Sequence, residues 1–338
     1  MATMKEVAQR AGVAVSTVSY AINGTRPISP QTRHRVEQAM RELDYRPNAV
    51  ARALASRRSR IIAVALPATG RGVGRTELDF VSGAVEAAEE HGYHVVVWPS
   101  ELHDRDDVDA LTAHGLVEGV LLMEVRLSDE RVEALLAAGR PLAMIGRTAD
   151  PTGLAYVDID FDRTLDDTVD HLVGLGHRHI AFLNHARAEH EAGYGPAVRA
   201  PEAFERAMER HGLVPIARFC ADEPADGEAV ATALLADEPR LTAAVVMNEP
   251  AIPGLFRALA AGGRRIPDDF SVVSVVSSLG VARMSIPALT VAVAPGHELG
   301  RRGVAVLLAA LEEREEEPTP QLLGCPLEIG DSTGPAPG

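Results

Sequence analysis

Residues 3–24, TMKEVAQRAGVAVSTVSYAING, decide the fold of the front of this chain. Thr3 and Glu6 have the spacing of a capping box, in which the hydroxyl accepts from a free N–H of the first turn and the carboxylate reaches back. A helix therefore begins here, and Gly12 permits the left-handed turn that ends it. A second helix, with apolar residues at helical spacing, follows over residues 15–22. Two helices across a tight glycine turn predict a helix-turn-helix.

A third helix completes a small core. Ser29 supplies its N-cap and Pro30 its first-turn proline. Val36, Met40 and Leu43 recur at helical spacing and form the buried stripe. Periodicity alone is also typical of any small helical bundle. The polar face of the second helix distinguishes a DNA-binding helix-turn-helix from such a bundle.

The polar face of the second helix favours DNA binding. In a helix-turn-helix the second helix lies in the major groove, and its N-terminal residues contact base edges. No acid occurs between Gln9 and Arg35. Hydroxyls can reach phosphates or bases, a methyl group suits thymine, and a phenol adds an aromatic contact. Those positions here are Val15, Ser16, Thr17, Ser19 and Tyr20.

Charge is distributed unevenly along the 338 residues, whose formal net charge is −15. Residues 1–60 carry 11 Lys/Arg and four Asp/Glu, a balance of +7, so the remainder carries −22. This asymmetry is expected when one segment meets phosphate and the rest does something else. With 46% apolar residues the chain can bury large cores, which excludes a disordered or fibrous protein.

A basic segment follows the three helices over residues 47–60. Pro47 suits a first helical turn, and residues 51–55 are good helix formers, but two turns are marginal in isolation. We expect a hinge helix that folds only when docked, with a plain basic linker as the alternative.

Taken together, these motifs resemble the headpiece of the LacI/GalR family of bacterial transcription regulators. The resemblance runs without a gap from about residue 3 to residue 60 and is carried by MKEVA (4–8), AGV (11–13), STVS (16–19), ING (22–24), SPQTR (29–33) and LDYRPN (43–48). It implies a dimer that places two recognition helices in successive major grooves of a near-palindromic operator. In the family, a leucine from each hinge helix wedges into the central minor groove and kinks the DNA, a role that falls on Leu54.

The resemblance also implies individual DNA contacts. Family members commonly carry a serine or threonine where this chain has Ala14 and often an arginine where it has Tyr20, so the operator sequence does not transfer. Base reading falls on Val15, Ser16 and Tyr20; phosphate or positioning contacts fall on Thr17, Ser19, Asn23, Thr32 and Tyr45; Met4, Lys5, Ser29, Asn48, Ala51, Arg52 and Leu54 complete the set.

Beyond residue 60, short apolar runs alternate with amphipathic segments. This alternation predicts parallel sheets covered by helices, and about ten strands favour two lobes over one sheet. Ligands in such folds bind at the carboxyl ends of the strands, so the cleft between the lobes is the expected site. Strands are predicted at 61–66, 94–98, 119–123, 142–145, 180–183, 243–247 and 271–276, and helices at 78–91, 129–138, 164–175 and 201–211.

The same family resemblance continues through VEGVL (117–121), LGHRHIAF (175–182), IPDDFSVV (266–273) and PALT (287–290). It implies a periplasmic-binding-protein-like core of two doubly wound lobes behind an all-α helix-turn-helix headpiece. The expected domains are 1–46 for DNA binding, 47–60 for the hinge and 61–330 for the effector-binding and dimerisation core. Within the core, lobe 1 is expected at 61–158 and 289–320, lobe 2 at 159–288 and 321–330, and a flexible tail at 331–338.

Effector contacts match the family less well. The family's strand-end asparagine is present as Asn248, whereas Val276 stands in place of its aspartate and Arg199 lies one residue from the position of its arginine. Because a carboxylate that accepts two sugar hydroxyls is missing, a simple sugar is not the expected effector. The candidate contacts are Trp98, Arg147, Arg199, Asn248 and Val276.

Other functions have weaker support. A solute-uptake protein would lack residues 1–60, and an enzyme would need titratable groups converging in the cleft, which the sequence does not identify. Asp158, Asp160 and Asp162 lack the glycine and glutamate of a calcium loop, and His171, His177, His179 and His185 have no cysteine nearby. We therefore expect neither catalysis nor a metal or cofactor. Two isolated cysteines and the absence of a signal sequence predict a cytoplasmic protein.

Overall fold

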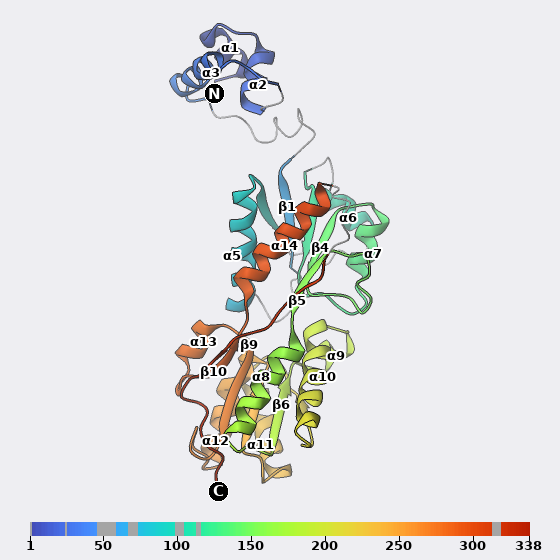
Figure 1. Cartoon of the computed structure of the whole chain (residues 1–338), viewed down its shortest axis with the longest axis vertical. Helices are drawn as coiled ribbons and strands as arrows, with labels where there is room; N and C mark the ends of the chain where they lie inside the picture. The colour runs from blue at the N-terminus through green and yellow to red at the C-terminus, as the bar shows by residue number, and fades with distance from the viewer. Residues whose placement is uncertain are drawn as a thin grey trace. The chain divides into compact units, whose positions relative to one another are not determined.

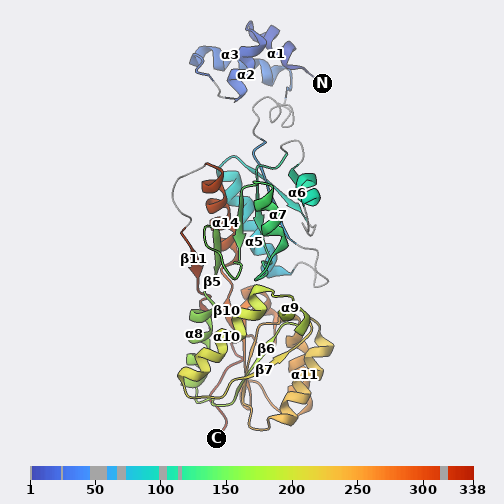
Figure 2. The same ribbon diagram turned by 90° about the vertical axis from the view of Figure 1, so that its right-hand side faces the viewer.

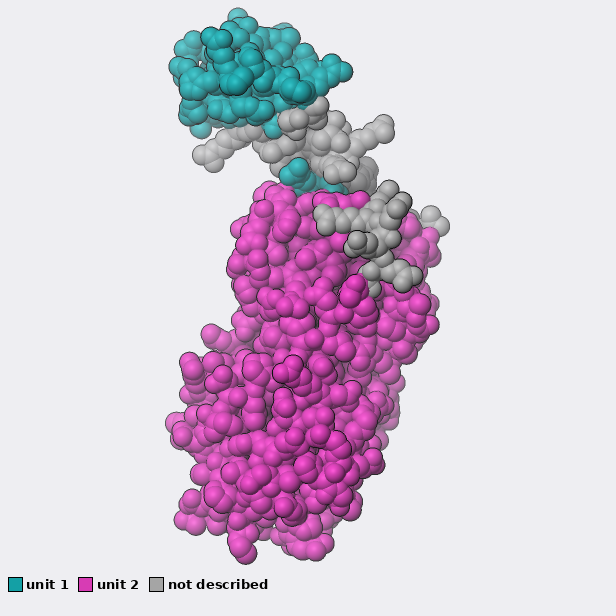
Figure 3. All heavy atoms as spheres, viewed as in Figure 1, with its two compact units in different colours: residues 1–61, 110–118 teal, residues 62–109, 119–338 magenta. Residues whose placement is uncertain are grey.

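The computed structural model describes residues 2–23, 26–45, 59–66, 74–98, 105–112, 116–312 and 319–338. The chain divides into two compact units, residues 1–61 with 110–118 and residues 62–109 with 119–338 (Figure 3). None of the helices in the described ranges has both the length and the apolar character needed to cross a bilayer.

The first unit contains the predicted helix-turn-helix, formed by α1 (Met4–Ala11), α2 (Val15–Asn23) and α3 (Pro30–Glu42). Thr3 and Glu6 form the capping box, with Thr3 N donating to the carboxylate at 2.7 Å and Glu6 N donating to the hydroxyl at 3.3 Å. Gly12 ends α1 at a φ of +64°, which a side chain would oppose. The three helices bury a shared core of Val7, Ala8, Ala11, Val18, Val36 and Ala39.

The second unit contains two six-stranded sheets, each covered by helices on both faces (Figures 1 and 2). Lobe 1 has the strand order β11-β5-β4-β3-β1-β2 and lobe 2 the order β12-β10-β9-β8-β6-β7. Successive residues of a strand point to opposite faces, and in β6 Phe182 packs with one core cluster while Leu183 packs with another. Burial on both faces explains the continuous apolar runs in the sequence.

Lobe 1 is built from β1 (Ile61–Ala65), α5 (Arg75–Glu90), β2 (His94–Trp98), α6 (Arg105–Thr112), β3 (Gly119–Leu122), α7 (Glu130–Ala137), β4 (Leu142–Ile145), β5 (Tyr156–Ile159), α14 (Gly296–Leu311) and β11 (Gln321–Leu323). Lobe 2 is built from α8 (Phe161–Gly174), β6 (Ile180–Asn184), α9 (Arg187–Glu191), α10 (Gly195–Arg210), β7 (Ile216–Phe219), α11 (Pro224–Asp237), β8 (Ala243–Val246), the 3-10 turn η2 (Glu249–Ala251), α12 (Ile252–Ala261), β9 (Ser271–Ser277), α13 (Leu279–Met284), β10 (Thr290–Val293) and β12 (Leu327–Glu328).

Two predicted lobe boundaries are wrong. Residues 289–293 were expected in lobe 1, but β10 pairs in parallel with β9 of lobe 2. Residues 321–323 were expected in lobe 2, but β11 pairs in parallel with β5 of lobe 1. The crossings from β10 to α14 and from β11 to β12 therefore fall a few residues after the predicted positions. Both strands are too short to show a clear apolar period, which explains the error.

The prediction of a flexible tail over residues 331–338 is also wrong. Ser332 is fully buried, and its hydroxyl accepts from Thr290 N at 2.8 Å and donates to the carbonyl of Val272 at 2.5 Å. Further along, Ala336 N donates to the carbonyl of Leu175 at 2.8 Å. Because these polar groups satisfy buried backbone atoms of lobe 2, the C-terminal segment is part of that lobe.

Candidate DNA-binding surface and effector cleft

The face of α2 expected to read DNA is accessible. Val15 is 44% exposed and Ser16 is exposed, whereas Thr17, Ser19 and Tyr20 are half-buried. Val18, one turn along the helix from Val15, is fully buried in the headpiece core. The helix thus anchors itself through Val18 and presents its hydroxyls and its methyl-bearing side chain outward.

Two arginines add positive charge beside α2. The guanidinium of Arg26 lies 5.5 Å from the centre of the Tyr20 ring, a cation–π distance. Arg33 Nη1 donates to the carbonyl of Ala21 at 3.2 Å, which ties α3 to the last turn of α2.

The remaining expected DNA contacts divide into three groups. Lys5 is exposed, whereas Met4 and Tyr45 are half-buried and pack against the headpiece core. Ser29 caps α3: its hydroxyl accepts from Thr32 N at 3.2 Å and lies 2.8 Å from the Thr32 hydroxyl. Asn48, Ala51, Arg52 and Leu54 lie outside the described residues, and Asn23 is described only as the last residue of α2.

A cavity of about 170 Å³ opens between the two lobes. It lies at the carboxyl ends of β3, β4 and β5 in lobe 1 and of β6, β8 and β9 in lobe 2, the place that parallel sheets favour for ligands. A cavity of ~150 Å³ is known to admit benzene, so this one admits a molecule of one ring or slightly more. Residues that line it include Glu77, Phe80, Met123, Glu124, Ile145, Asp158, His185, Tyr194, Asp222, Met247, Glu249, Val276 and Leu299.

Several backbone turns that shape the cavity have positive φ. Glu124 has a φ of +55° two residues after β3, and Gly146 has a φ of +104° directly after β4. Val276 has a φ of +56°, which is rare for a β-branched residue, and lies where the pairing of β9 with β10 shifts register. Such conformations cost free energy and are concentrated at binding sites.

Asp158 is the most deeply buried carboxylate of the cavity, with 5% of its surface exposed. Its Oδ2 lies 3.0 Å from Arg147 Nη1 and 4.0 Å from Arg199 Nη1. Burial raises the pKa of this carboxyl above its usual value, although both guanidinium groups favour the ionised form.

Arg199 connects the two lobes. It lies on α10 of lobe 2, and its Nη2 donates to the carbonyls of Arg147 at 2.8 Å and Thr148 at 3.1 Å, both in lobe 1. Nearby, Gly195 N donates to the carbonyl of Val125 at 3.0 Å. These bonds hold the lobes together beside the cavity.

Of the five effector contacts expected from the sequence, Val276 lines the cavity and the other four do not. Arg147 and Arg199 bind Asp158 behind the wall, and Asn248 is fully buried with its amide donating to the carbonyl of Cys220 at 2.7 Å. Trp98 ends β2 at the edge of the lobe 1 sheet. Trp98, Arg147, Arg199 and Asn248 are thus absent from the described lining of this cavity, and their contact with an effector stays a prediction.

Sequence reasoning missed most of the carboxylates in the cavity. Glu124 and Glu249 follow predicted strands by one and two residues, so the rule of carboxyl-terminal strand ends would have found both. Asp158 was considered only for a calcium loop, but Asp160 caps α8 and Asp162 pairs with Arg206. Within the described ranges, no three His, Cys, Asp or Glu side chains are grouped to hold a metal ion.

Both cysteines are buried, and burial raises the pKa of the Cys220 and Cys325 thiols to about 12. Neither thiol is therefore a nucleophile at neutral pH.

Two segments of the chain match known protein families. Residues 3–48 match the bacterial regulatory proteins of the lacI family, and residues 169–333 match the periplasmic binding protein-like domain. The chain is 29% identical to the HTH-type transcriptional regulator AglR of Rhizobium meliloti, over 99% of this chain and 95% of AglR. It is also 29% identical to the transcriptional repressor PurR of Haemophilus influenzae, over 94% of this chain and 93% of PurR.

The chain also resembles solved structures of transcriptional regulators. The lac repressor dimer bound to operator and the anti-inducer ONPF superposes with a TM-score of 0.82 at 27% identity, covering 98% of this chain and 99% of that one. The transcriptional regulator CelR in complex with cellobiose superposes with a TM-score of 0.73 at 26% identity, covering 98% and 100%.

Proposed function

This chain belongs to the lacI family of bacterial regulatory proteins, and from that premise we propose that it is a homodimeric repressor whose affinity for a near-palindromic operator depends on a small molecule bound between its lobes. It is a DNA-binding transcriptional regulator and not an enzyme. The observation that carries the proposal is the accessible face of α2, with Val15 and Ser16 exposed over a fully buried Val18.

In this proposal α2 enters the major groove. Val15, Ser16 and Tyr20 read base edges, with the Val15 methyl groups suited to thymine and the Ser16 hydroxyl able to donate or accept. The remaining residues position the headpiece and the hinge segment on the phosphate backbone of the DNA, and Leu54 is the minor-groove wedge. The positioning residues are Met4, Lys5, Thr17, Ser19, Asn23, Ser29, Thr32, Tyr45, Asn48, Ala51 and Arg52.

Regulation follows from linkage between the lobes and the DNA. An effector that binds one lobe arrangement more tightly than another raises the population of that arrangement. Because the lobe arrangement and DNA binding are linked, the affinity for DNA changes with it. Arg199 supports this mechanism, because its bonds to the carbonyls of Arg147 and Thr148 exist only while the lobes are close together. Repression needs no further chemistry, since a protein bound over a promoter blocks polymerase. The site of action is the cytoplasm, where the operator lies.

A second copy of the chain is the expected partner. Strand β2 is an edge of the lobe 1 sheet and carries exposed Val96 and Val97, at 37% and 45% exposure. Exposed apolar edges are costly for a monomer and are usually covered. The lac repressor, with which the chain superposes over nearly its full length, is a dimer on its operator.

Selection of genomic fragments bound by the purified full-length protein tests the function. We expect one enriched family of near-palindromic sequences close to a promoter, and raised output from that promoter when the gene is deleted. Binding without sequence preference would contradict the proposal.

Variants of α2 test the reading face. Ser16→Ala and Tyr20→Ala should each weaken binding to the enriched sequence by about ten- to a hundredfold, while changing binding to random DNA little. Gln38→Ala, on the exposed side of α3, serves as the control and should bind as the unaltered protein does. Equal losses on specific and random DNA would remove the base-reading role.

A further inference from the structure

Resting on the proposed function of the cleft as effector site, we infer that the effector is a protonated amine on an apolar or aromatic body of about one ring. The wall of the cavity supplies both halves of this description. Its volume of about 170 Å³ limits the size, and the two kinds of side chain that line it set the chemistry.

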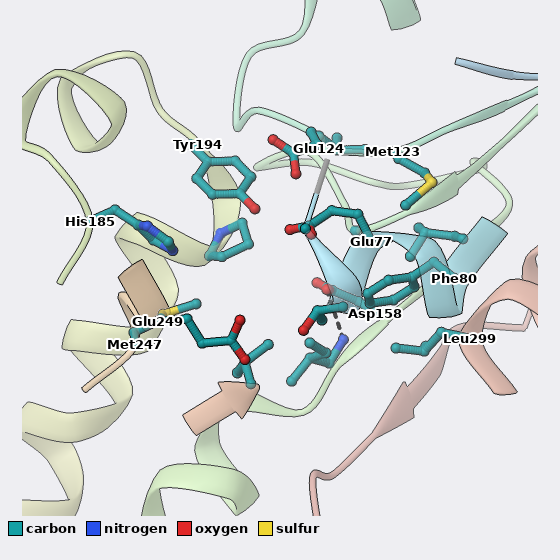
Figure 4. A pocket seen from close by; sticks show the side chains of 18 of the residues that line it. Glu77, Phe80, Met123, Glu124, Asp158, His185, Tyr194, Met247, Glu249 and Leu299 are labelled. Atoms are coloured by element: carbon teal, nitrogen blue, oxygen red, sulfur yellow. Dashed lines mark hydrogen bonds between the residues drawn. The ribbon is translucent and has the colours of Figure 1, made fainter. Parts of the chain in front are cut away.

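The first half is negative charge from both lobes. Five carboxylates line the cavity, and no lysine or arginine is among the described residues that do so. Figure 4 shows the carboxylates of Glu77, Glu124, Asp158 and Glu249 directed toward the centre of the cavity. They come from separate segments of the chain: Glu77 from α5, Glu124 from the turn after β3, Asp158 from β5 and Glu249 from the turn after β8. The cavity therefore concentrates negative charge where a ligand sits.

Two arginines lie beside Asp158, a histidine lies beside Asp222, and the groups bonded to Glu249 are neutral. Asp158 has Arg147 and Arg199, and Asp222 Oδ1 lies 3.2 Å from His185 Nδ1. Glu249 accepts hydrogen bonds from neutral groups, the Ser277 hydroxyl and the Ser278 N–H at 3.0 Å. Hydrogen bonds of this kind fix a carboxylate in place but leave its charge uncompensated. A cation in the cavity would complete the pairing, whereas an anion would be repelled.

The second half is apolar and aromatic. Phe80, Met123, Ile145, Met247 and Leu299 line the cavity, and Tyr194 faces it from lobe 2 (Figure 4). Methionine adapts to irregular ligand shapes, and aromatic faces attract a desolvated ammonium group. Figure 4 shows this apolar group mainly on the α5 and β3 side, so a ligand with one charged end and one apolar end fits both parts.

Neutral sugars fit this wall less well. Val276 presents a hydrocarbon side chain at the end of β9, and Asn248, whose amide nitrogen donates to the carbonyl of Cys220, does not line the cavity. A polyol could donate hydroxyl hydrogen bonds to these carboxylates, but it would bring them no positive charge and has no apolar body to fill the side formed by Phe80 and Met123. The ammonium group of an amine pairs with the carboxylates, and its apolar body packs against the apolar side of the cavity.

Three isosteric probes test the inference on the purified full-length protein without DNA: 2-phenylethylamine, 2-phenylethanol and phenylacetate, with glucose as a polyol. By calorimetry the amine should bind at least about tenfold more tightly than the alcohol or glucose, because a hydrogen bond to an ionised partner is worth about 1.4 kcal/mol or more. Phenylacetate should bind most weakly. An alcohol or a sugar that binds as tightly as the amine would overturn the cationic assignment while leaving the cleft an effector site.

Charge-neutral variants identify the carboxylates. Glu77→Gln and Glu249→Gln should each weaken amine binding about tenfold and leave binding of the alcohol unchanged. Glu89→Gln, an exposed position on the same helix as Glu77, is the matched control and should bind the amine as the unaltered protein does. Absence of amine binding, or equal losses for amine and alcohol, would overturn the inference. Neither outcome touches the DNA-binding proposal, which is tested without ligand.

Discussion

At the scale of single residues, His177 illustrates how the second unit satisfies a buried polar group. Its Nε2 lies 3.1 Å from the carbonyl of Gly334, and its Nδ1 lies 2.9 Å from the Thr242 hydroxyl. Because a carbonyl only accepts, Nε2 carries a proton, and when the ring is neutral Nδ1 accepts from the Thr242 hydroxyl. Burial lowers the pKa of His177 below 6.5, which keeps this arrangement at neutral pH. The histidine thus joins the C-terminal segment to the sheet of lobe 2.

This geometry predicts how stability depends on pH. The unfolded chain takes up a proton at His177 near pH 6.5 and the folded chain does so only at lower pH, so stability is fully present above 6.5 and declines as the pH falls from there toward the folded pKa. The decline reaches about 1.4 kcal/mol per pH unit at most. Urea unfolding at several pH values measures it. His177→Gln should flatten the dependence, whereas His94→Gln, at an exposed position, should not. An unchanged slope in both variants would contradict the assignment.

The exposure of Val15 and Ser16 agrees with a prediction that needs only one helix. Both were assigned to DNA contact because they begin the second helix of the helix-turn-helix, and the structure exposes both. The cavity is lined by residues at the ends of strands from two lobes. The local sequence pattern does not show which of these strand ends come together. Arg199 and Asp158, 41 positions apart, meet only after both sheets have formed.

At the scale of elements, glycines set how closely helices pack. α5 and α14 cross with Gly83 against the backbone of His297 and Gly300 against the backbone of Phe80. A Cβ on Gly300 would overlap the carbonyl oxygen of Phe80, which cannot rotate away. Gly227 on α11 lies against the backbone of Ala251, just before α12. Gly254 on α12 lies against the backbone of Pro224 and Glu228 on α11. The close packing of α5 on α14 fixes the helix from which Glu77 and Phe80 reach the cavity.

Gly300→Ala should therefore destabilise the protein by about 1–3 kcal/mol, the usual range for overpacking. Gly174→Ala is the matched control, since it lies at the end of α8 with no atom within 4 Å of the added Cβ, and it should raise stability by about 0.5–1 kcal/mol. Chemical denaturation followed by circular dichroism compares the two. A Gly300→Ala variant as stable as the unaltered protein would show that the helices separate at no cost.

The helices with a clear cap were predicted closely, and the short strands were not. Thr3, Gly12, Ser29 and Pro30 determine the ends of α1 and the start of α3 by local chemistry alone. β11 and β12 have three and two residues, and their pairing partners lie more than 30 positions away in the sequence. Their place in a sheet depends on neighbours that a local pattern does not contain.

At the scale of the whole molecule, Arg199 is a side chain of lobe 2 that bonds to lobe 1. Its side chain is 13% exposed and meets Asp158 together with two backbone carbonyls of lobe 1. Arg199→Met should lower the free energy of unfolding by about 1–3 kcal/mol, since two lobe 1 carbonyls lose their charged donor while Asp158 keeps Arg147. Arg206→Met, on the same helix but in an exposed pair with Asp162, should cost less than about 1 kcal/mol. Equal losses in urea unfolding would refute the inter-lobe role.

The uneven charge of the chain also belongs to this scale. Exposed Lys5, Arg26 and Arg33 give the headpiece the positive charge expected of a surface that meets phosphate, whereas the rest of the chain is acidic. Charge segregation was visible in the sequence, because it requires no knowledge of contacts. The acidic cavity was not, because the same negative charges are spread over the core and only the fold shows which of them converge.

Titration of a labelled operator with the full-length protein, and of the same duplex with one half-site scrambled, tests the central claim most directly. If two headpieces read two half-sites, two chains bind each intact operator and the scrambled duplex loses at least about a hundredfold in affinity, since each mismatched base pair costs about 1–3 kcal/mol. Equal affinity for both duplexes, or one chain per operator, would contradict the account.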